Sequence, residues 1–281
     1  MPERNSKITA PAISTAPDRG ERIAMMTAYD YPQGRMVDES DVDIVLVGDS
    51  LAMVVLGHED TLSVTMDEML HHVRAVRRGV NRALLVADMP FGSFHLGPDQ
   101  AVSNALRFVK EAGAEAVKIE GGRLDVVEAL VGAEIPVMAH LGLTPQSVHK
   151  LGGFKVQGRG DSARKELLAS ALDLEAAGAF SLVLECVPTE LAREVSEALE
   201  IPTIGIGAGP HCDGQVLVLH DLLGLEDRLA PKFVRRYAEL GKTAREAIAD
   251  FVSDVRDGSF PSESESYDDP TRASQVRQIY G

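Results

Sequence analysis

The sequence predicts a single α/β domain folded as a (β/α)₈ TIM barrel. Its 281 residues are enough for one such barrel, and eight short apolar runs alternate with helical patterns along the chain. Most of the runs are continuously apolar, which is typical of parallel strands covered on both faces. A doubly wound open sheet shows the same alternation and stays open as the alternative fold.

The predicted strands are the apolar runs at residues 23–29, 44–48, 83–88, 116–120, 136–140, 181–185, 202–207 and 215–220. Two parts of the chain also repeat one pattern of helix, glycine, strand, glutamate, helix and strand. In these repeats Glu120 follows Gly113 by seven residues, and Glu185 follows Gly178 by seven residues. A strand–helix unit that repeats within one compact length favours the barrel.

Helical patterns fill most gaps between the strands. One begins after Thr65, a suitable N-cap, and ends at Gly79. A longer helix is predicted over residues 232–258, with one apolar stripe made by Phe233, Tyr237, Leu240, Ile248, Val252 and Val255. This helix is longer than a barrel needs, so we expect it to cap the barrel or to mediate assembly.

Both ends of the chain are polar. Residues 1–20 and 262–281 are predicted to be flexible tails, which leaves residues 21–261 as the barrel with its C-terminal helix. The N-terminus has no apolar signal core, and no apolar run reaches the length of a transmembrane helix. The two cysteines, Cys186 and Cys212, form no C-x-x-C pair. We therefore expect a cytoplasmic protein with reduced thiols.

The charge balance bears on the class of partner. Formal net charge is −15, with 44% hydrophobic and 25% charged residues. A nucleic-acid partner or an anionic membrane surface requires a basic patch, so this balance argues against both. A small molecule bound in a local pocket is compatible with an acidic protein.

Carboxylates stand where four predicted strands end. Strands two, three, four and six end in Asp49, Asp88, Glu120 and Glu185, and His140 ends strand five. Active sites of barrels lie at the carboxyl ends of the strands. Unpaired carboxylates gathered there would repel one another, so a positive group is expected among them.

Two candidates can supply that positive charge. Lys118 precedes Glu120 by two residues and therefore faces the same side of its strand. The other candidate is Mg²⁺, which prefers oxygen ligands and takes one or two protein carboxylates. Asp49 and Asp88 are then the expected ligands, with Glu120 close by or acting through water.

This arrangement leaves Glu185 free for proton transfer. The alternative is that the acids form rim salt bridges with nearby arginines and lysines. His140 either orients a substrate or packs as a core histidine.

Nine stretches of the sequence resemble, in the same order, the ketopantoate hydroxymethyltransferase family. They are MMTAYDY, LVGDSLAMVVLGHEDTLSVT, VADMPFGS, VKIEGG, AHLGLTPQSV, LGGFKVQGRG, LVLECVP, IPTIGIGAGPHCDGQVLVLHD and PKFVRRY. The resemblance runs from about residue 20 to about residue 267. It implies a (β/α)₈ barrel that assembles as a homo-oligomer, usually a decamer.

The resemblance also implies a reaction in pantothenate biosynthesis. A hydroxymethyl group passes from 5,10-methylenetetrahydrofolate to 3-methyl-2-oxobutanoate, which gives 2-dehydropantoate and tetrahydrofolate. Glu185 matches the general base of the family, and Asp49, Asp88 and Glu120 match its Mg²⁺ site. The implied substrate contacts are Asp49, Ser50, Asp88 and Lys118, with His140 as a further candidate.

Two rival functions remain, and the chain departs from the family near its end. A Mg²⁺-dependent lyase or mutase of the phosphoenolpyruvate mutase kind would share the barrel and the acids, but LTPQSV and GGFKVQGRG favour hydroxymethyl transfer. A catalytically silent barrel is the second rival, and the intact acid set with Lys118 speaks against it.

Glu265 and Tyr267 replace the usual His and Phe of the family, and a tail over residues 268–281 follows.

Overall fold

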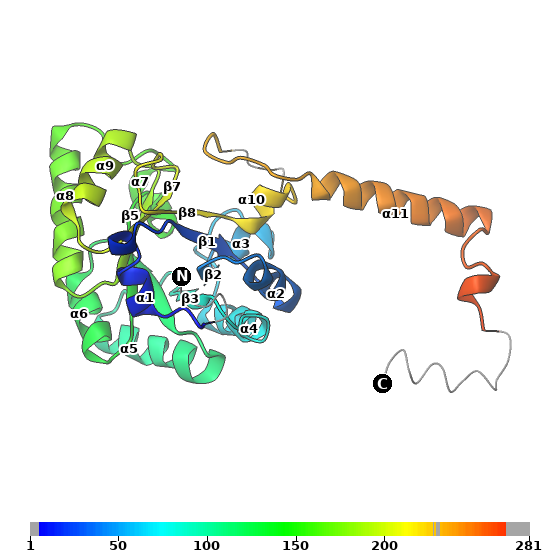
Figure 1. The fold of residues 1–281 in the computed structure, drawn as a ribbon, viewed down its shortest axis with the longest axis horizontal. Helices are drawn as coiled ribbons and strands as arrows, with labels where there is room; N and C mark the ends of the chain where they lie inside the picture. The colour runs from blue at the N-terminus through cyan, green and yellow to red at the C-terminus, as the bar shows by residue number, and fades with distance from the viewer. Residues whose placement is uncertain (1–5, 227, 229–230, 268–281) are drawn as a thin grey trace.

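The chain forms a closed barrel of parallel strands in the order β1-β2-β3-β4-β5-β6-β7-β8, with β8 paired to β1 (Figure 1). This computed structural model describes residues 6–226, 228 and 231–267. The strands are β1 Ile23–Thr27, β2 Ile44–Val47, β3 Leu84–Asp88, β4 Ala116–Glu120, β5 Val137–Gly142, β6 Ser181–Glu185, β7 Thr203–Ile206 and β8 Gly214–Leu217. The predicted (β/α)₈ barrel is confirmed, and the open-sheet alternative is excluded.

Helices surround the barrel and alternate with its strands. The outer helices are α2 Tyr31–Glu39, α4 Met66–Arg77, α5 Pro98–Arg107, α6 Leu124–Gly132, α8 Asp161–Ala176, α9 Thr189–Ala198 and α10 Leu219–Leu223. A π-helical segment, Phe108–Ala112, continues α5. Short helices α3 Leu51–Val54 and α7 Val148–Leu151 lie in the segments that follow β2 and β5, and a 3₁₀ turn, Pro145–Ser147, precedes α7.

Most strand residues are apolar because the strands pack on two sides. On β2, Ile44 and Leu46 belong to the cluster inside the barrel, and Val45 and Val47 belong to the cluster beneath the helices. All four side chains are buried. An alternating polar pattern would leave polar groups in one of these two cores, so the sequence shows a continuous apolar run.

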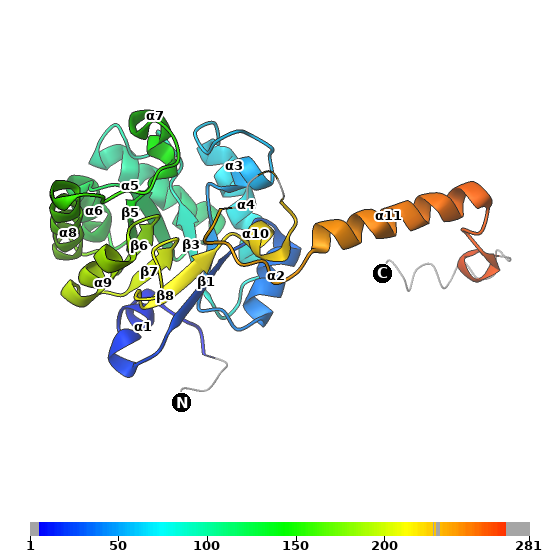
Figure 2. The same cartoon turned by 90° about the horizontal axis from the view of Figure 1, so that it is seen from above.

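The N-terminal segment differs from the predicted tail. Residues Ala10–Ser14 form α1, and a 3₁₀ turn follows at Pro17–Arg19. Ile13 and Ala16 are buried in the cluster inside the barrel. Figure 2 shows α1 at the end of the barrel opposite α3 and α7. This segment closes the floor of the barrel. Its apolar residues recur three positions apart, and they cover the apolar side chains inside the barrel.

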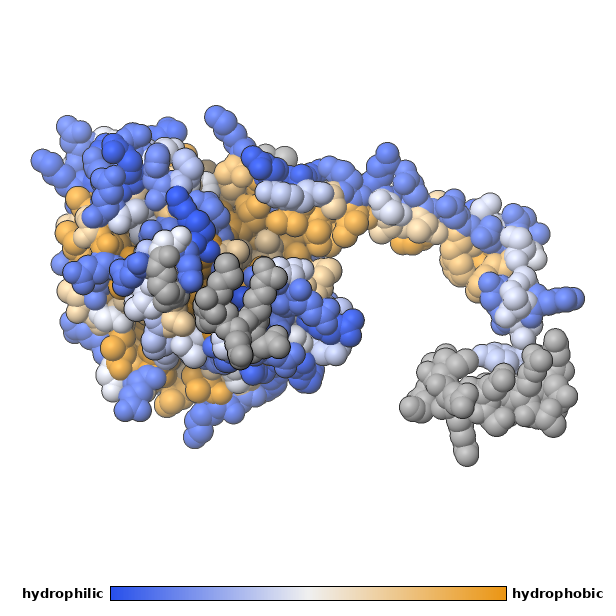
Figure 3. All heavy atoms as spheres, in the orientation of Figure 1, coloured by the Kyte–Doolittle hydropathy of each residue, from blue (hydrophilic) through white to orange (hydrophobic). Residues whose placement is uncertain are grey.

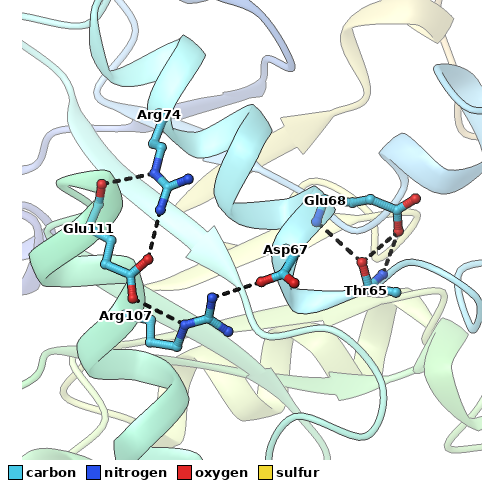
Figure 4. Close-up of polar contacts among 6 residues, drawn as sticks. All are labelled: Thr65, Asp67, Glu68, Arg74, Arg107 and Glu111. Atoms are coloured by element: carbon cyan, nitrogen blue, oxygen red, sulfur yellow. Dashed lines mark hydrogen bonds and ion pairs between the residues drawn. The ribbon is translucent and has the colours of Figure 1, made fainter.

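Helix α4 begins where its sequence predicts. The Thr65 hydroxyl accepts a hydrogen bond from the Glu68 amide, and the Glu68 carboxylate accepts one from the Thr65 amide. Figure 4 shows this capping box beside ion pairs that join Arg107 to Asp67 at 2.7 Å and to Glu111 at 3.2 Å. These pairs lie at the surface, so the cap and the buried face of α4 carry more of its stability.

The last helix is shorter than predicted and projects away from the barrel (Figure 1). Helix α11 spans Leu240–Asp257, so the predicted start at residue 232 is wrong. The preceding segment is not helical because it follows the barrel instead. Phe233 packs against Gly207, and the Tyr237 amide donates a hydrogen bond to the Leu222 carbonyl.

Helix α11 has no buried residue among those described. Ile248, Phe251 and Val255 are 62%, 52% and 49% exposed. Figure 3 shows apolar side chains gathered along one side of this arm. A 3₁₀ turn at Glu263–Glu265 follows, and the remainder of the predicted C-terminal tail, residues 268–281, lies outside the described residues. None of the helices described here is both long and apolar enough to cross a membrane.

Candidate active site

The side chains predicted to form the site meet in one cavity at the carboxyl end of the barrel strands. The cavity has a volume of about 680 Å³. Its lining includes every residue that the sequence singled out, namely Asp49, Ser50, Asp88, Lys118, Glu120, His140 and Glu185. The structure therefore brings the predicted residues together, and the roles assigned to them stay predictions.

Strand register explains why these side chains converge. Asp88 on β3 lies beside Lys118 on β4, and Glu120 lies beside His140 on β5. Residues two apart on a strand face the same side, so Lys118 and Glu120 both face the barrel axis. A glycine suits position 48, because a Cβ on that residue would stand 2.8 Å from the Ser50 Oγ.

A line of polar contacts crosses the floor of the cavity. Lys118 Nζ lies 2.6 Å from Asp88 Oδ1 and 3.4 Å from His140 Nδ1. His140 Nε2 lies 3.3 Å from Glu185 Oε2, and its Nδ1 lies 3.6 Å from Glu120 Oε1. Lys118 and His140 are 4% and 2% exposed, so the line is shielded from solvent. It links the ends of β3, β4, β5 and β6.

Burial and neighbouring charges shift the pKa values of these groups. Burial raises the pKa of Asp49 well above its usual value, and the nearby Asp88 and Glu120 raise that pKa further. Burial also raises the pKa of Asp88, against the opposing effect of Lys118. Burial alone would lower the pKa of Lys118, but the surrounding carboxylates of Asp88, Glu120 and Asp49 raise it overall. Lys118 is therefore a fixed positive charge.

His140 is balanced between opposing influences. Burial and Lys118 lower its pKa, but contacts with Glu120 and Glu185 outweigh them and raise the pKa to about 9. Burial would raise the pKa of Glu120, and the contacts with His140 and Lys118 lower it overall. The contacts with Glu120 and Glu185 therefore favour the protonated form of His140, and its role in the site stays a prediction.

The donor set at the site fits a magnesium ion. The four predicted carboxylates lie in the cavity beside two groups that can be positive, Lys118 and His140, and a divalent cation would balance the excess of negative charge. Asp49 and Asp88 would hold the ion. In the part of the chain that is described, no three His, Cys, Asp or Glu side chains are arranged as a metal site. Two carboxylates are nevertheless enough for Mg²⁺, because this ion takes few protein ligands and keeps several waters.

Two residues of the site were missed by the sequence reasoning. Tyr29 places its hydroxyl 2.9 Å from the Ser50 Oγ, and Gln146 contacts both Asp49 and Glu120. Gln146 lies within LTPQSV, six residues after His140, and its place in the turn after β5 is the signal that could have identified it. A neutral amide has no charge to balance, so electrostatic reasoning passes over it.

A (β/α)₈ barrel with a cavity at the carboxyl end of its strands, lined by buried carboxylates and a lysine, is typical of barrel enzymes. A sequence model described as ketopantoate hydroxymethyltransferase matches residues 7–263. The chain belongs to the ketopantoate hydroxymethyltransferase family and is a transferase.

Its relatives carry a consistent name. The 3-methyl-2-oxobutanoate hydroxymethyltransferase of Heliobacterium modesticaldum is 56% identical, over 93% of this chain and 95% of its own. The enzyme of the same name from Oleidesulfovibrio alaskensis is 57% identical, over 94% of this chain and 91% of its own.

Solved structures of lower identity share the fold. Phosphonopyruvate hydrolase in complex with oxalate and Mg²⁺ aligns with a TM-score of 0.61 at 14% identity, over 97% of this chain and 96% of its own. A 2,3-dimethylmalate lyase of the PEP mutase/isocitrate lyase superfamily aligns with a TM-score of 0.60 at 16% identity, over 97% and 93%.

Proposed function

We propose that the protein transfers a hydroxymethyl group from 5,10-methylenetetrahydrofolate to 3-methyl-2-oxobutanoate, as a step of pantothenate biosynthesis. The products are 2-dehydropantoate and tetrahydrofolate. One observation carries the proposal: the line of contacts Asp88–Lys118–His140–Glu185 brings a fixed positive charge and a carboxylate into one cavity, with His140 between them. An enolisation needs both, a charge beside the forming enolate and a base for the proton. The names of the relatives supply the oxo acid and the transferred group, and the family resemblance supplies the folate donor.

Asp49 and Asp88 would hold Mg²⁺ in this proposal, and the bound ion would supply Lewis-acid polarisation of the oxo acid. Lys118 stabilises the negative charge that develops on the keto oxygen, at no cost of reorganisation because Asp88 already holds its ammonium group. Ser50 is positioned by Tyr29 to contact the substrate.

Glu185 removes the proton from C3 of the oxo acid. The electron pair of the broken C3–H bond forms the new bond to the methylene carbon. A water molecule supplies the hydroxyl group, and both bonds from that carbon to folate nitrogens break. The proton from C3 and one proton from water end on the two nitrogens, so the reaction is balanced. His140 orients the Glu185 carboxylate.

The cavity also suits a second, larger substrate. Its volume of about 680 Å³ lies within the range of roughly 300–1,000 Å³ that is typical of sites for drug-sized ligands. Apolar side chains line it beyond the carboxylates, among them Met53, Phe154, Val156 and Phe233. A flat pterin ring fits such a lining, and the polar floor suits the small oxo acid.

We propose a cytoplasmic homo-oligomer, a decamer by family resemblance, with no nucleic-acid or membrane partner. The exposed apolar side of α11 supports assembly, because a projecting helix with Ile248, Phe251 and Val255 in solvent is covered most simply by another subunit. The net charge of −15 argues against nucleic acid.

Mass spectrometry of the purified protein tests the reaction. With 3-methyl-2-oxobutanoate, 5,10-methylenetetrahydrofolate and Mg²⁺, we expect 2-dehydropantoate to form, and we expect a chelator to stop its formation. Omission of the folate is the control. Failure of the folded, Mg²⁺-loaded protein to form product would reject the proposal, and cleavage of 2,3-dimethylmalate or phosphonopyruvate would favour the lyase alternative.

A further inference from the structure

Gln146 is buried beneath the site although it lies in a connecting segment. It belongs to the 3₁₀ turn Pro145–Ser147 after β5, and it is 5% exposed. Its amide Nε2 donates to Asp49 Oδ2 and to the Met89 carbonyl, both at 2.9 Å. Its backbone amide donates to Glu120 Oε2 at 2.9 Å. One residue therefore holds carboxylates from two different strand ends.

The orientation of the side-chain amide is fixed by its neighbours. If the amide were reversed, its oxygen would face Asp49 Oδ2 and the Met89 carbonyl oxygen, and both of these are acceptors. Only the NH₂ group satisfies both contacts. Gln146 Oε1 consequently points elsewhere, and it is a buried acceptor with no hydrogen-bond partner among the described residues.

We propose that Gln146 is a positioning residue that orients the Asp49 carboxylate for the metal. The described hydrogen bonds tie Asp49 and Glu120 each through one oxygen, Oδ2 and Oε2. This leaves the second oxygen of Asp49 for a cation. The inference rests on the proposed function, because it concerns the Mg²⁺ site of that reaction.

The chemistry of the residue explains why an amide serves here. A glutamate would place acceptors against the acceptors of Asp49 and Met89 and would add another carboxylate to a cluster where burial and repulsion already raise the pKa of Asp49. An arginine or lysine would compete with the metal for Asp49. A neutral donor orients the carboxylate and leaves its charge available, as partners of metal ligands do in other sites.

The test measures metal binding directly. Gln146→Met keeps a side chain of similar length and removes only the amide, and its backbone N–H still bonds to Glu120. Electron paramagnetic resonance of free Mn²⁺ reports the Kd of the metal in wild-type and variant protein. We expect the Kd of the variant to rise about 10- to 100-fold. We expect activity to recover as Mg²⁺ is raised above the new Kd, which a general folding defect would not allow.

Gln157→Met is the matched control. Gln157 donates to the Lys155 carbonyl at 2.9 Å and makes no described contact with the carboxylates, so the Mn²⁺ Kd should stay at the wild-type value. Gln146→Asn is a second variant, with an amide too short to reach Asp49, and it should weaken binding as Gln146→Met does. A wild-type Kd in either folded Gln146 variant would overturn the inference, and so would failure of both variants to fold.

The two proposals fail in different ways. If the wild-type protein binds Mn²⁺ and Gln146→Met binds it more weakly, but no 2-dehydropantoate is formed, the proposed function fails and the role of Gln146 stands. If product is formed and the metal affinity does not depend on Gln146, the positioning role fails and the transfer reaction stands.

Discussion

Glu185→Gln separates the chemistry of the site from its binding. The side chain is 17% exposed, and its Oε2 lies 3.3 Å from His140 Nε2. Glutamine has the same shape, and its amide oxygen can accept a hydrogen bond from His140 Nε2. The variant therefore keeps the geometry of the site and loses only the basic carboxylate.

The magnitude follows from the role of a general base. A positioned base contributes about 10²- to 10⁴-fold, which corresponds to about 3–5 kcal/mol of activation free energy. We expect kcat to fall by that factor. Mg²⁺ and 3-methyl-2-oxobutanoate should still bind with Kd values within about threefold of the wild type, because Asp49, Asp88 and Lys118 are unchanged.

Proton exchange in D₂O is the direct assay. NMR follows the loss of the C3 proton signal of 3-methyl-2-oxobutanoate in the presence of Mg²⁺ and without folate. This loss reports only the proton abstraction that we assign to Glu185. Glu190→Gln is the control, because this exposed carboxylate of α9 pairs with Arg193 outside the cavity. Exchange at the wild-type rate in Glu185→Gln would refute the reasoning, and loss of metal binding would place Glu185 among the ligands instead.

Three further predictions concern the scaffold. Gly142→Ala should lower the free energy of unfolding in urea by about 2–4 kcal/mol and reduce activity. The φ of Gly142 is +95°, and the new Cβ would stand 2.2 Å from the Glu185 carbonyl oxygen. Unchanged stability would contradict this prediction. Asp38→Asn should lower the free energy of unfolding by about 2–3 kcal/mol and leave activity intact. The buried Asp38 carboxylate accepts hydrogen bonds from the backbone N–H groups of residues 81–83. A loss of stability below about 0.5 kcal/mol would argue against this role. Ile248→Asp should shift the mass in light scattering to smaller species, and an unaltered mass would remove α11 from the interface.

The sequence predicted the barrel because its strands are apolar on both faces. On β2, alternate residues pack inside the barrel and beneath the helices, and that requirement is visible as an unbroken run such as IVLV. The site followed from the same reasoning, because a polar residue just after such a run must lie at the carboxyl end of a strand.

Features that depend on tertiary contacts were not readable in this way. Helix α1 has only five residues and lies within a polar stretch of the sequence, and Ile13 is buried because this helix covers the open barrel floor. The helical stripe predicted from residue 232 included Phe233, which packs against Gly207 instead. Gln146 was missed because its role consists of hydrogen bonds to residues 97 and 26 positions earlier in the chain.

A carbon tracer tests the central claim most directly. The protein would be supplied with 5,10-methylenetetrahydrofolate labelled with ¹³C in the methylene group, unlabelled 3-methyl-2-oxobutanoate and Mg²⁺, and the products followed by ¹³C NMR. The account predicts that the label appears in the hydroxymethyl carbon of 2-dehydropantoate and that a chelator prevents its transfer. Label that stays on folate while the Mg²⁺-loaded protein is folded would contradict it.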